Sequence, residues 1–165
     1  MKINISQQEF EFLQHSNWIE KEDSNSALED AVSTWCFAKE YKEPINIPFI
    51  KEIHQNLMKR INPLIAGKIR RCPIYVGNSQ IGYEECLKPE LIQKELSKWA
   101  EEYSNPKEEE NIKQAHIKLL KIHPFEDGNG RTGRIVMNYQ RLKAQLPILI
   151  IHKGQEQFEY YKWFK

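Results

Sequence analysis

The chain has 165 residues and a mass of 19.7 kDa, which suits one compact domain. It is 40% hydrophobic and 28% charged with a net charge of +1, which excludes disordered and collagen-like chains and argues against nucleic-acid binding. There is no signal-peptide-like N-terminus, no run of roughly 20 apolar residues to span a membrane, and no C-x-x-C pair among the three cysteines. We therefore expect a cytoplasmic protein that binds neither nucleic acid nor membrane.

The first part of the chain predicts three helices. A short helix is expected over residues 5–15. Residues 26–29, Ser-Ala-Leu-Glu, have the form of a capping box and predict a second helix that stops before Pro44. Asn46 is expected to cap a third helix, which ends before Pro63.

The pattern then changes to one β-hairpin followed by further helices. Residues 65–83 alternate loosely and are punctuated by proline and glycine, which predicts the hairpin. Helices are expected from Pro89, from an N-cap and capping-box signal in residues 105–108, and over residues 130–145 and 155–164. The predicted fold is mostly α-helical with one small hairpin.

Residues 123–134, HPFEDGNGRTGR, hold three of the seven glycines at a turn between two predicted helices. Backbone N–H groups of residues 128–130 can point at one spot at the positive end of the following helix, which is a ready site for phosphate oxygens. Arg131 and Arg134 are three residues apart on the opening turn, so both guanidinium groups can reach toward that place. The pattern is typical of polyphosphate binding.

Two further side chains of this stretch suit chemistry on a nucleotide. Asp127 lies beside the anion site, and Mg²⁺ prefers few carboxylates together with phosphate oxygens. His123 precedes it, and a histidine can accept a proton from an attacking hydroxyl. The structural alternative is a common Gly-Asn-Gly turn after a helix-end histidine. Two arginines at a helix start oppose the helix dipole, however, and this favours a negatively charged ligand.

The same stretch matches in full the signature HPFx[DE]GNGRxxR of the Fic family, and the hairpin resembles the flap of that family. The resemblance covers most of the chain. It implies a single Fic domain over residues 1–165, with an all-α core of several helices and one β-hairpin flap. It also implies an ATP- and Mg²⁺-dependent enzyme that transfers AMP to a Ser, Thr or Tyr hydroxyl of a target protein, a reaction called AMPylation.

The resemblance assigns roles to individual residues. His123 resembles the base that deprotonates the target hydroxyl, Asp127 the ligand of Mg²⁺, and Phe125 an apolar anchor of the loop. The ATP phosphates would be bound by an anion hole, formed by Gly128, Asn129 and Gly130. Two cationic side chains, Arg131 and Arg134, would also contact them. The family's phosphotransferase branch resembles HPFxxANKR, which this sequence does not match.

A second motif lies in residues 5–22, which resemble the inhibitory helix of many Fic proteins. Ser16 and Glu20 fit its pattern [ST]xxxE[GN], whereas Lys21 departs from the last position. A Glu20–Arg134 ion pair would occupy the clamp for the γ-phosphate and leave ATP in a pose unfit for attack. The alternative is that Glu20 is a solvated surface acid.

The remaining expectations concern the hairpin, two residues of the helix over 130–145 and the other histidines. In the family the flap binds the target by strand addition, which Ile74, Tyr75 and Val76 would provide here, although Ile74 and Val76 can instead cover the core. Asn138 and Tyr139 can reach the nucleoside. His116 is interpreted as a core or helix-face histidine, and three others, at positions 15, 54 and 152, are given no role.

Three alternatives to AMP transfer remain at this point. One is removal of AMP from a modified protein, with Glu20 positioning water. Another is a non-catalytic nucleotide-binding module, against which the intact His123 and Asp127 argue. The third is a DNA-binding role, which the near-neutral charge disfavours. The target protein is not identified by the sequence; self-modification and a homo-oligomer are both compatible with it.

Overall fold

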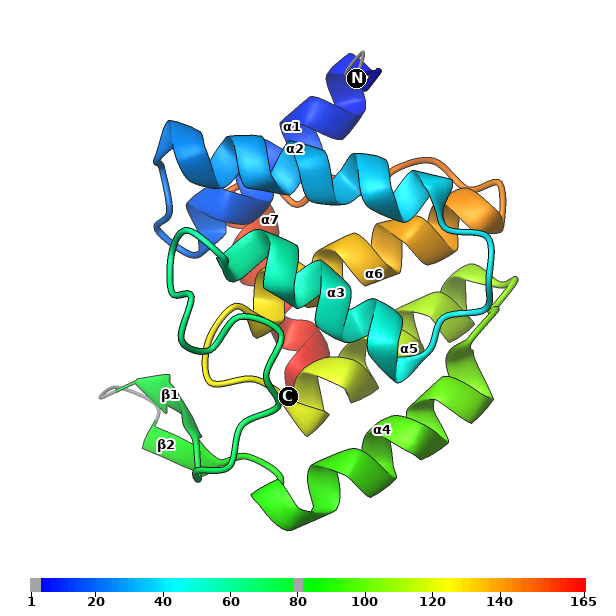
Figure 1. Ribbon diagram of the computed structural model, residues 1–165. Helices are drawn as coiled ribbons and strands as arrows, with labels where there is room; N and C mark the ends of the chain where they lie inside the picture. The colour runs from blue at the N-terminus through cyan, green and yellow to red at the C-terminus, as the bar shows by residue number, and fades with distance from the viewer. Residues whose placement is uncertain (1–3, 79–81) are drawn as a thin grey trace.

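The computed structural model describes residues 4–78 and 82–165. Within these residues the chain is mostly helical with one antiparallel hairpin, as predicted (Figure 1). The elements in chain order are α1 (Gln7–Ile19), α2 (Asn25–Glu40), α3 (Ile47–Met58), β1 (Tyr75–Asn78), β2 (Gly82–Glu85), α4 (Pro89–Tyr103), α5 (Glu109–Ile122), α6 (Asn129–Lys143), α7 (Gln155–Tyr161) and a 3-10 turn, Lys162–Phe164.

Helix α6 lies at the centre of the bundle. It packs against α1, α2, α3 and α5, and nearly all of its residues are buried (Figure 1). The main core around it includes Trp35, Phe49, Trp99, Phe125 and Tyr139. Because α6 is enclosed by helices, its N-terminal end and the loop before it are held by the rest of the fold.

The N-terminal helix is longer than the predicted span of residues 5–15. It begins after Ser6, whose hydroxyl accepts the N–H of Glu9 (3.2 Å), while the Glu9 carboxylate accepts the N–H of Ser6 (2.6 Å). It continues to Ile19 because Ser16, a weak helix former, is buried there and gains contacts that stabilise the helix.

Two predicted capping signals were wrong. The cap of α2 is Ser24, whose hydroxyl accepts the N–H of Ala27 (3.2 Å), and Ser26 lies inside the first turn. Asn105 does not cap α5, which begins four residues later after Glu108. Tertiary packing decides both starts, because the burial of helix faces outweighs a local cap of about 1 kcal/mol. Asn46 does cap α3, by accepting the N–H of Phe49 (2.9 Å).

The hairpin is shorter than residues 65–83 and stands out from the bundle (Figure 1). Its register pairs Tyr75 with Glu85 and Gly77 with Tyr83. Residues 79–81, which belong to the predicted span, lie outside the described part of the chain. Among the described helices, none is long and apolar enough to cross a membrane.

Candidate active site

The loop between α5 and α6 is a tight turn made by two residues in the left-handed region. His123 ends α5 with a φ of 50°, and Gly128 precedes α6 with a φ of 75°. At Gly128 a side chain would also collide with Met58, because a Cβ there would lie 2.8 Å from the sulfur. The turn therefore requires glycine at 128 for both conformation and space.

The loop is clamped to the core through Asn129 and Phe125. The Asn129 side chain accepts the backbone N–H of Phe125 (2.9 Å) and donates to its carbonyl (2.9 Å). The Phe125 ring is fully buried, as its predicted anchor role requires. The Asn129 side chain is thus committed to holding the loop, and what it offers at the start of α6 is its backbone N–H.

His54 supports the loop from beneath. Its ring stacks on Phe125, with centroids 3.7 Å apart, and its Nδ1 accepts the N–H of Gly67 (2.9 Å). Burial lowers the pKa of His54 to about 4, so the ring is neutral and its Nε2–H donates to the Asp127 carbonyl (2.9 Å). No role was predicted for this residue, since a lone histidine in a sequence gives no sign of the backbone groups that it will contact.

Arg70 joins the loop to the base of the hairpin. Its guanidinium is buried and donates to four backbone carbonyls. These belong to His123 (2.6 Å), Leu87 (2.5 Å), Cys72 (2.9 Å) and, at a longer 3.5 Å, Ile122. The role of Arg70 was not predicted either, because nothing in the sequence around it marks a buried arginine.

His123 and Asp127 both lie on this loop. The Nδ1 of His123 faces the Leu120 carbonyl (3.3 Å), and burial lowers the pKa of the ring. A neutral His123 that donates from Nδ1 keeps its Nε2 lone pair, to which no described residue donates. Asp127 is exposed, and one of its carboxylate oxygens accepts the N–H of Gly128 (2.6 Å).

The Glu20–Arg134 ion pair expected from the sequence is present. The guanidinium of Arg134 is buried and bonds to the Glu20 carboxylate (2.7 Å), the Ser16 hydroxyl (2.9 Å) and the Ser16 carbonyl (2.9 Å). The Glu20 carboxylate also lies against Gly130, where any Cβ would overlap it. The acid from α1 therefore sits at the N-terminal end of α6, in the position suited to an anion.

Arg131 and Arg134 contact different helices instead of a shared point. Arg131 is directed toward α3, where an Nη lies 3.3 Å from the Met58 sulfur. Its buried Nε has no hydrogen-bond partner among the described residues. A buried donor without a partner costs about 1–3 kcal/mol, so this face of α6 is suited to gaining an acceptor.

The expectation that Asn138 and Tyr139 reach a nucleoside was wrong. Both side chains are buried and hold other segments of the chain: Asn138 exchanges two hydrogen bonds with the backbone of Leu149 (2.8 and 3.0 Å), and Tyr139 donates to the Tyr41 carbonyl (2.8 Å). They are buried because α6 is packed against four other helices. A helix expected to be amphipathic would instead leave one face exposed.

His116 is a core histidine, as predicted. It is buried between the Gly133 carbonyl (3.1 Å from Nδ1) and the Tyr160 hydroxyl (2.8 Å from Nε2). Burial and the nearby Arg134 lower its pKa to about 3.

The hairpin exposes its side chains. Tyr75 is 60% and Val76 41% exposed, so the alternative in which Val76 covers the core was wrong, while Ile74 is half-buried. The Ile74 carbonyl accepts a cross-strand hydrogen bond (2.8 Å), and bonded pairs alternate in an antiparallel ladder. The backbone groups of Tyr75 and Gly77 therefore point to the outer edge of β1, which pairs only with β2 among the described strands.

Comparisons with known proteins agree with this geometry. The model of the Fic/DOC family matches residues 44–140. The chain is 36% identical to the protein adenylyltransferase Fic of Drosophila melanogaster over 126 residues. This match covers 75% of this chain but only 25% of the relative. The chain thus spans about a quarter of the length of such curated relatives.

Solved structures share the fold. A Fic domain-containing signaling protein from Bacteroides thetaiotaomicron has a TM-score of 0.80 at 19% identity and covers 93% of this chain and 69% of its own. The BepC protein of Bartonella tribocorum, solved with bound AMPPNP, has a TM-score of 0.55 at 18% identity and covers 78% of this chain and 69% of its own. At these identities the likeness establishes the arrangement of helices and hairpin.

Proposed function

This chain belongs to the Fic/DOC family, and from that membership we propose that it is a protein adenylyltransferase, which transfers AMP from ATP to a Ser, Thr or Tyr hydroxyl of a target protein. The observation that carries the proposal is the loop of residues 123–130. It presents a neutral histidine and an exposed carboxylate beside the N-terminal end of α6. The curated relatives carry the same activity in their names.

In the proposed reaction His123 is the general base. Its Nε2 lone pair accepts the proton of the target hydroxyl while the hydroxyl oxygen forms a bond to the α-phosphorus of ATP. The bond from that phosphorus to the bridging oxygen breaks, and pyrophosphate leaves with the electron pair. Burial keeps His123 neutral, so the lone pair is available at neutral pH.

The phosphates are proposed to lie at the start of α6. The first N–H groups of this helix, from Asn129, Gly130 and Arg131, have no partner within the helix and no side-chain cap in the described chain. Arg131 offers its Nε, which has no partner among the residues described, and Arg134 offers a guanidinium that now binds the Glu20 carboxylate. Both are suited to phosphate oxygens.

The residues present fit a magnesium ion bound together with ATP. Asp127 is an exposed carboxylate with one oxygen fixed by the Gly128 N–H, which leaves the other for an ion. Mg²⁺ takes one or two protein carboxylates and completes its shell with phosphate and water. When bound, it would neutralise charge on the phosphates, with Asp127 as its protein ligand.

Glu20 is proposed to inhibit the enzyme in this conformation. Its carboxylate forms an ion pair with the guanidinium of Arg134 and contacts Gly130, and both of these residues are proposed to bind phosphate. Ser16 supports the pair by bonding the same guanidinium twice. ATP would have to displace Glu20 before its γ-phosphate could reach Arg134, and α1 is then the regulatory element of the fold.

The target is proposed to dock along β1, where the outward backbone groups of Tyr75 and Gly77 can pair with an extended segment. Ile74, Tyr75 and Val76 would flank that segment. Main-chain hydrogen bonds can position a target hydroxyl without requiring a particular sequence around it. The chain itself is therefore also a candidate target. The free, partly buried cysteines at 36, 72 and 86 suit a reducing compartment such as the cytoplasm.

The test is label transfer from ATP carrying the label at either the α- or the γ-phosphate, with Mg²⁺ and host lysate. The proteins are wild type, Glu20→Gly, Glu22→Gly as a matched control for flexibility near the end of α1, and Glu20→Gly combined with His123→Ala. We expect α-label only, at least tenfold more of it in Glu20→Gly than in wild type or Glu22→Gly, and a loss of about 10²–10⁴-fold without His123.

Transfer of the γ-label would contradict adenylyl transfer. Equal activity of Glu20→Gly and Glu22→Gly would contradict inhibition by the carboxylate.

Removal of AMP from a modified protein is a second candidate, because the Glu20 carboxylate lies against Gly130 at the proposed phosphate site and can orient a water molecule there. A protein labelled by the Glu20→Gly variant distinguishes the two. Wild type would release labelled AMP from it, and Glu20→Gly would not. Retention of the label by both would leave transfer as the activity.

A further inference from the structure

A cluster of ionisable side chains lies away from the proposed active site, between α1 and the segment before α7. Glu11 and His15 are four residues apart on one face of α1, and His152 comes from the other segment. One candidate ligand atom from each lies within 4.8 Å of the other two, and all three side chains are half-buried. Neither histidine was given a role from the sequence, because 137 positions separate them and only the fold brings them together.

His152 is oriented as a metal-binding histidine would be. Its Nδ1 bonds the Glu156 carboxylate (2.7 Å), and its Nε2 faces the Glu11 carboxylate (3.0 Å). The Glu156 carboxylate is fixed in turn by the backbone N–H of His152 (3.0 Å). A carboxylate that accepts the N–H of one ring nitrogen leaves the lone pair of the other nitrogen for a metal, and metal-bound histidines almost always have such a partner.

His15 supplies the second nitrogen. Its ring lies edge-on to that of His152, with centroids 4.7 Å apart. Its Nδ1 holds a lone pair, because it accepts the backbone N–H of Lys153. That bond is 3.2 Å long, so a metal ion can compete for the lone pair.

We propose that Glu11, His15 and His152 form a binding site for a divalent transition-metal ion of the Zn²⁺ class. Two imidazoles favour Zn²⁺, Ni²⁺ or Co²⁺ over Mg²⁺ and Ca²⁺, which prefer oxygen ligands only. Ligand atoms around tetrahedral Zn²⁺ lie about 3.4 Å apart, so small side-chain rotations suffice to close the cluster. Two histidines and one glutamate leave a fourth position for water.

An ion at this site would join α1 to the segment before α7. Ser16 follows the ligand His15 directly in α1, and Glu20 is the residue that caps the end of this helix. Both bond to Arg134. The ion would therefore restrict the same helix whose movement frees Arg134. This consequence rests on the proposed function, whereas the site itself does not.

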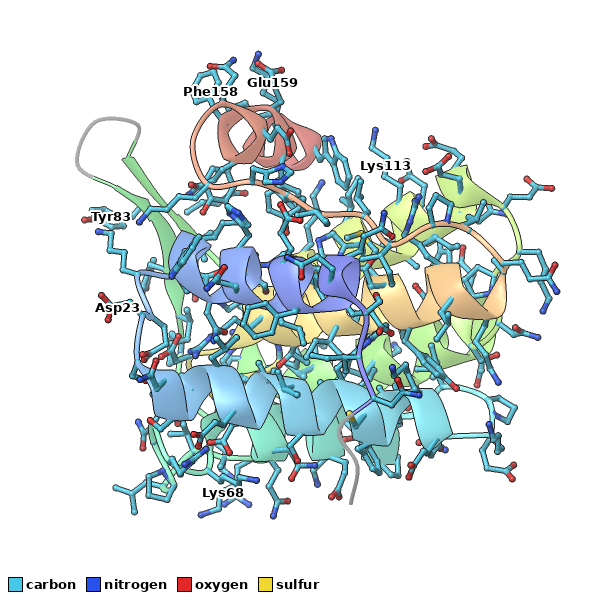
Figure 2. The ribbon with its side chains drawn as sticks, turned by 90° about the horizontal axis from the view of Figure 1, so that it is seen from above. Asp23, Lys68, Tyr83, Lys113, Phe158 and Glu159 are labelled. Carbon is cyan, nitrogen blue, oxygen red and sulfur yellow. The ribbon has the colours of Figure 1, made fainter. Side chains whose placement is uncertain are left out.

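The experiment is calorimetric titration of tag-free protein with ZnCl₂ in a His123→Ala background, which removes the histidine of the proposed active site. We expect one ion per chain, at least tenfold weaker binding in His15→Ala and in His152→Ala, and about tenfold weaker binding in Glu156→Gln. Glu159→Gln is the matched control, because Glu159 lies on the same helix and points outward (Figure 2); it should bind as the background protein does.

Hydrogen exchange provides a second readout that is independent of activity. Zn²⁺ should slow amide exchange in α1 of the His123→Ala background, and not when His152→Ala is added, with unfolding curves in the absence of metal confirming that each variant is folded. The proposal is overturned by an absence of saturable binding, or by binding that survives the combined loss of His15 and His152. In either case the cluster is an ion-pair network of His152 with Glu11 and Glu156, and AMP transfer remains testable by label.

Discussion

The loop of residues 123–130 and the hairpin β1–β2 are neighbours built in opposite ways. The loop is fixed from beneath by His54, Phe125 and Asn129, whose hydrogen bonds and stacking are buried. The hairpin exposes the described side chains of both strands, and no other strand in residues 4–78 and 82–165 pairs with its edge. A rigid loop suits the positioning of a base and of phosphates, while an exposed backbone edge suits partners of varied sequence.

Arg70 is the junction of these two regions. It donates to the carbonyls of Ile122 and His123 on the loop side and to those of Cys72 and Leu87 on either side of the hairpin. One buried guanidinium thus sets where the exposed edge stands relative to the proposed base.

The largest expected effect comes from breaking this junction. Arg70→Leu leaves four carbonyls without their donor, and we expect a loss of about 3–5 kcal/mol in the free energy of unfolding, measured by urea denaturation. Arg70→Lys keeps the charge but cannot reach all four acceptors, so it should fall between Leu and wild type. Wild-type stability of Arg70→Leu would show that the loop and the hairpin are positioned independently.

The second largest effect should come from acid, which should lower the free energy of unfolding through two buried histidines, one of which supports the loop. Burial lowers the pKa of His54 to about 4 and that of His116 to about 3, so the folded protein keeps both neutral where the unfolded chain, with a pKa near 6.5, takes up protons. The contribution of these two histidines to the free energy of unfolding is therefore complete above pH 6.5. It falls as the pH drops toward 4, by about 1.4 kcal/mol per pH unit for each histidine.

Urea midpoints at pH 7, 6 and 5 measure this slope. His116→Gln should remove a large part of it, because one of the two histidines with the most strongly lowered pKa values is gone. A pH-independent midpoint over this range would mean that the two rings are not held neutral.

The smallest effects concern the hairpin. Two substitutions of Tyr75 separate the contribution of its backbone to target binding from that of its side chain. Tyr75→Pro removes an N–H directed to the outer edge of β1, and we expect transfer to a protein target to fall about tenfold, as the loss of a main-chain hydrogen bond implies. Tyr75→Ala keeps that N–H and should reduce transfer less than about threefold, with ATP binding unchanged in both. The reverse order would assign target binding to the exposed ring.

The proposed reacting groups could be predicted from the sequence because they lie in one stretch. His123, Asp127 and the residues at the start of α6 are neighbours along the chain, so local turn and helix rules bring them together. Ser16 and Glu20 were found at a distance of over a hundred residues only through resemblance, and their ion pair with Arg134 is present in the structure.

The support of the loop could not be predicted, and the reason is physical. His54 and Arg70 act on backbone carbonyls far along the chain, and a carbonyl is the same at every position, so it leaves no mark in the sequence. The misplaced caps at Ser26 and Asn105 have a related cause. Polar residues suited to capping are common near helix starts, and the burial of a helix face decides which one is used.

The contact between Glu20 and Arg134 also sets how strongly this protein would bind ATP. If only the molecules with an open pair bind ATP productively, the apparent dissociation constant is the intrinsic one divided by the open fraction. A pair that is open in about one molecule in a hundred would weaken apparent affinity about a hundredfold. Any partner that binds the displaced form of α1 would then act as an activator, because it would raise the fraction of molecules with an open pair. Such a partner would not need to contact the loop of residues 123–130.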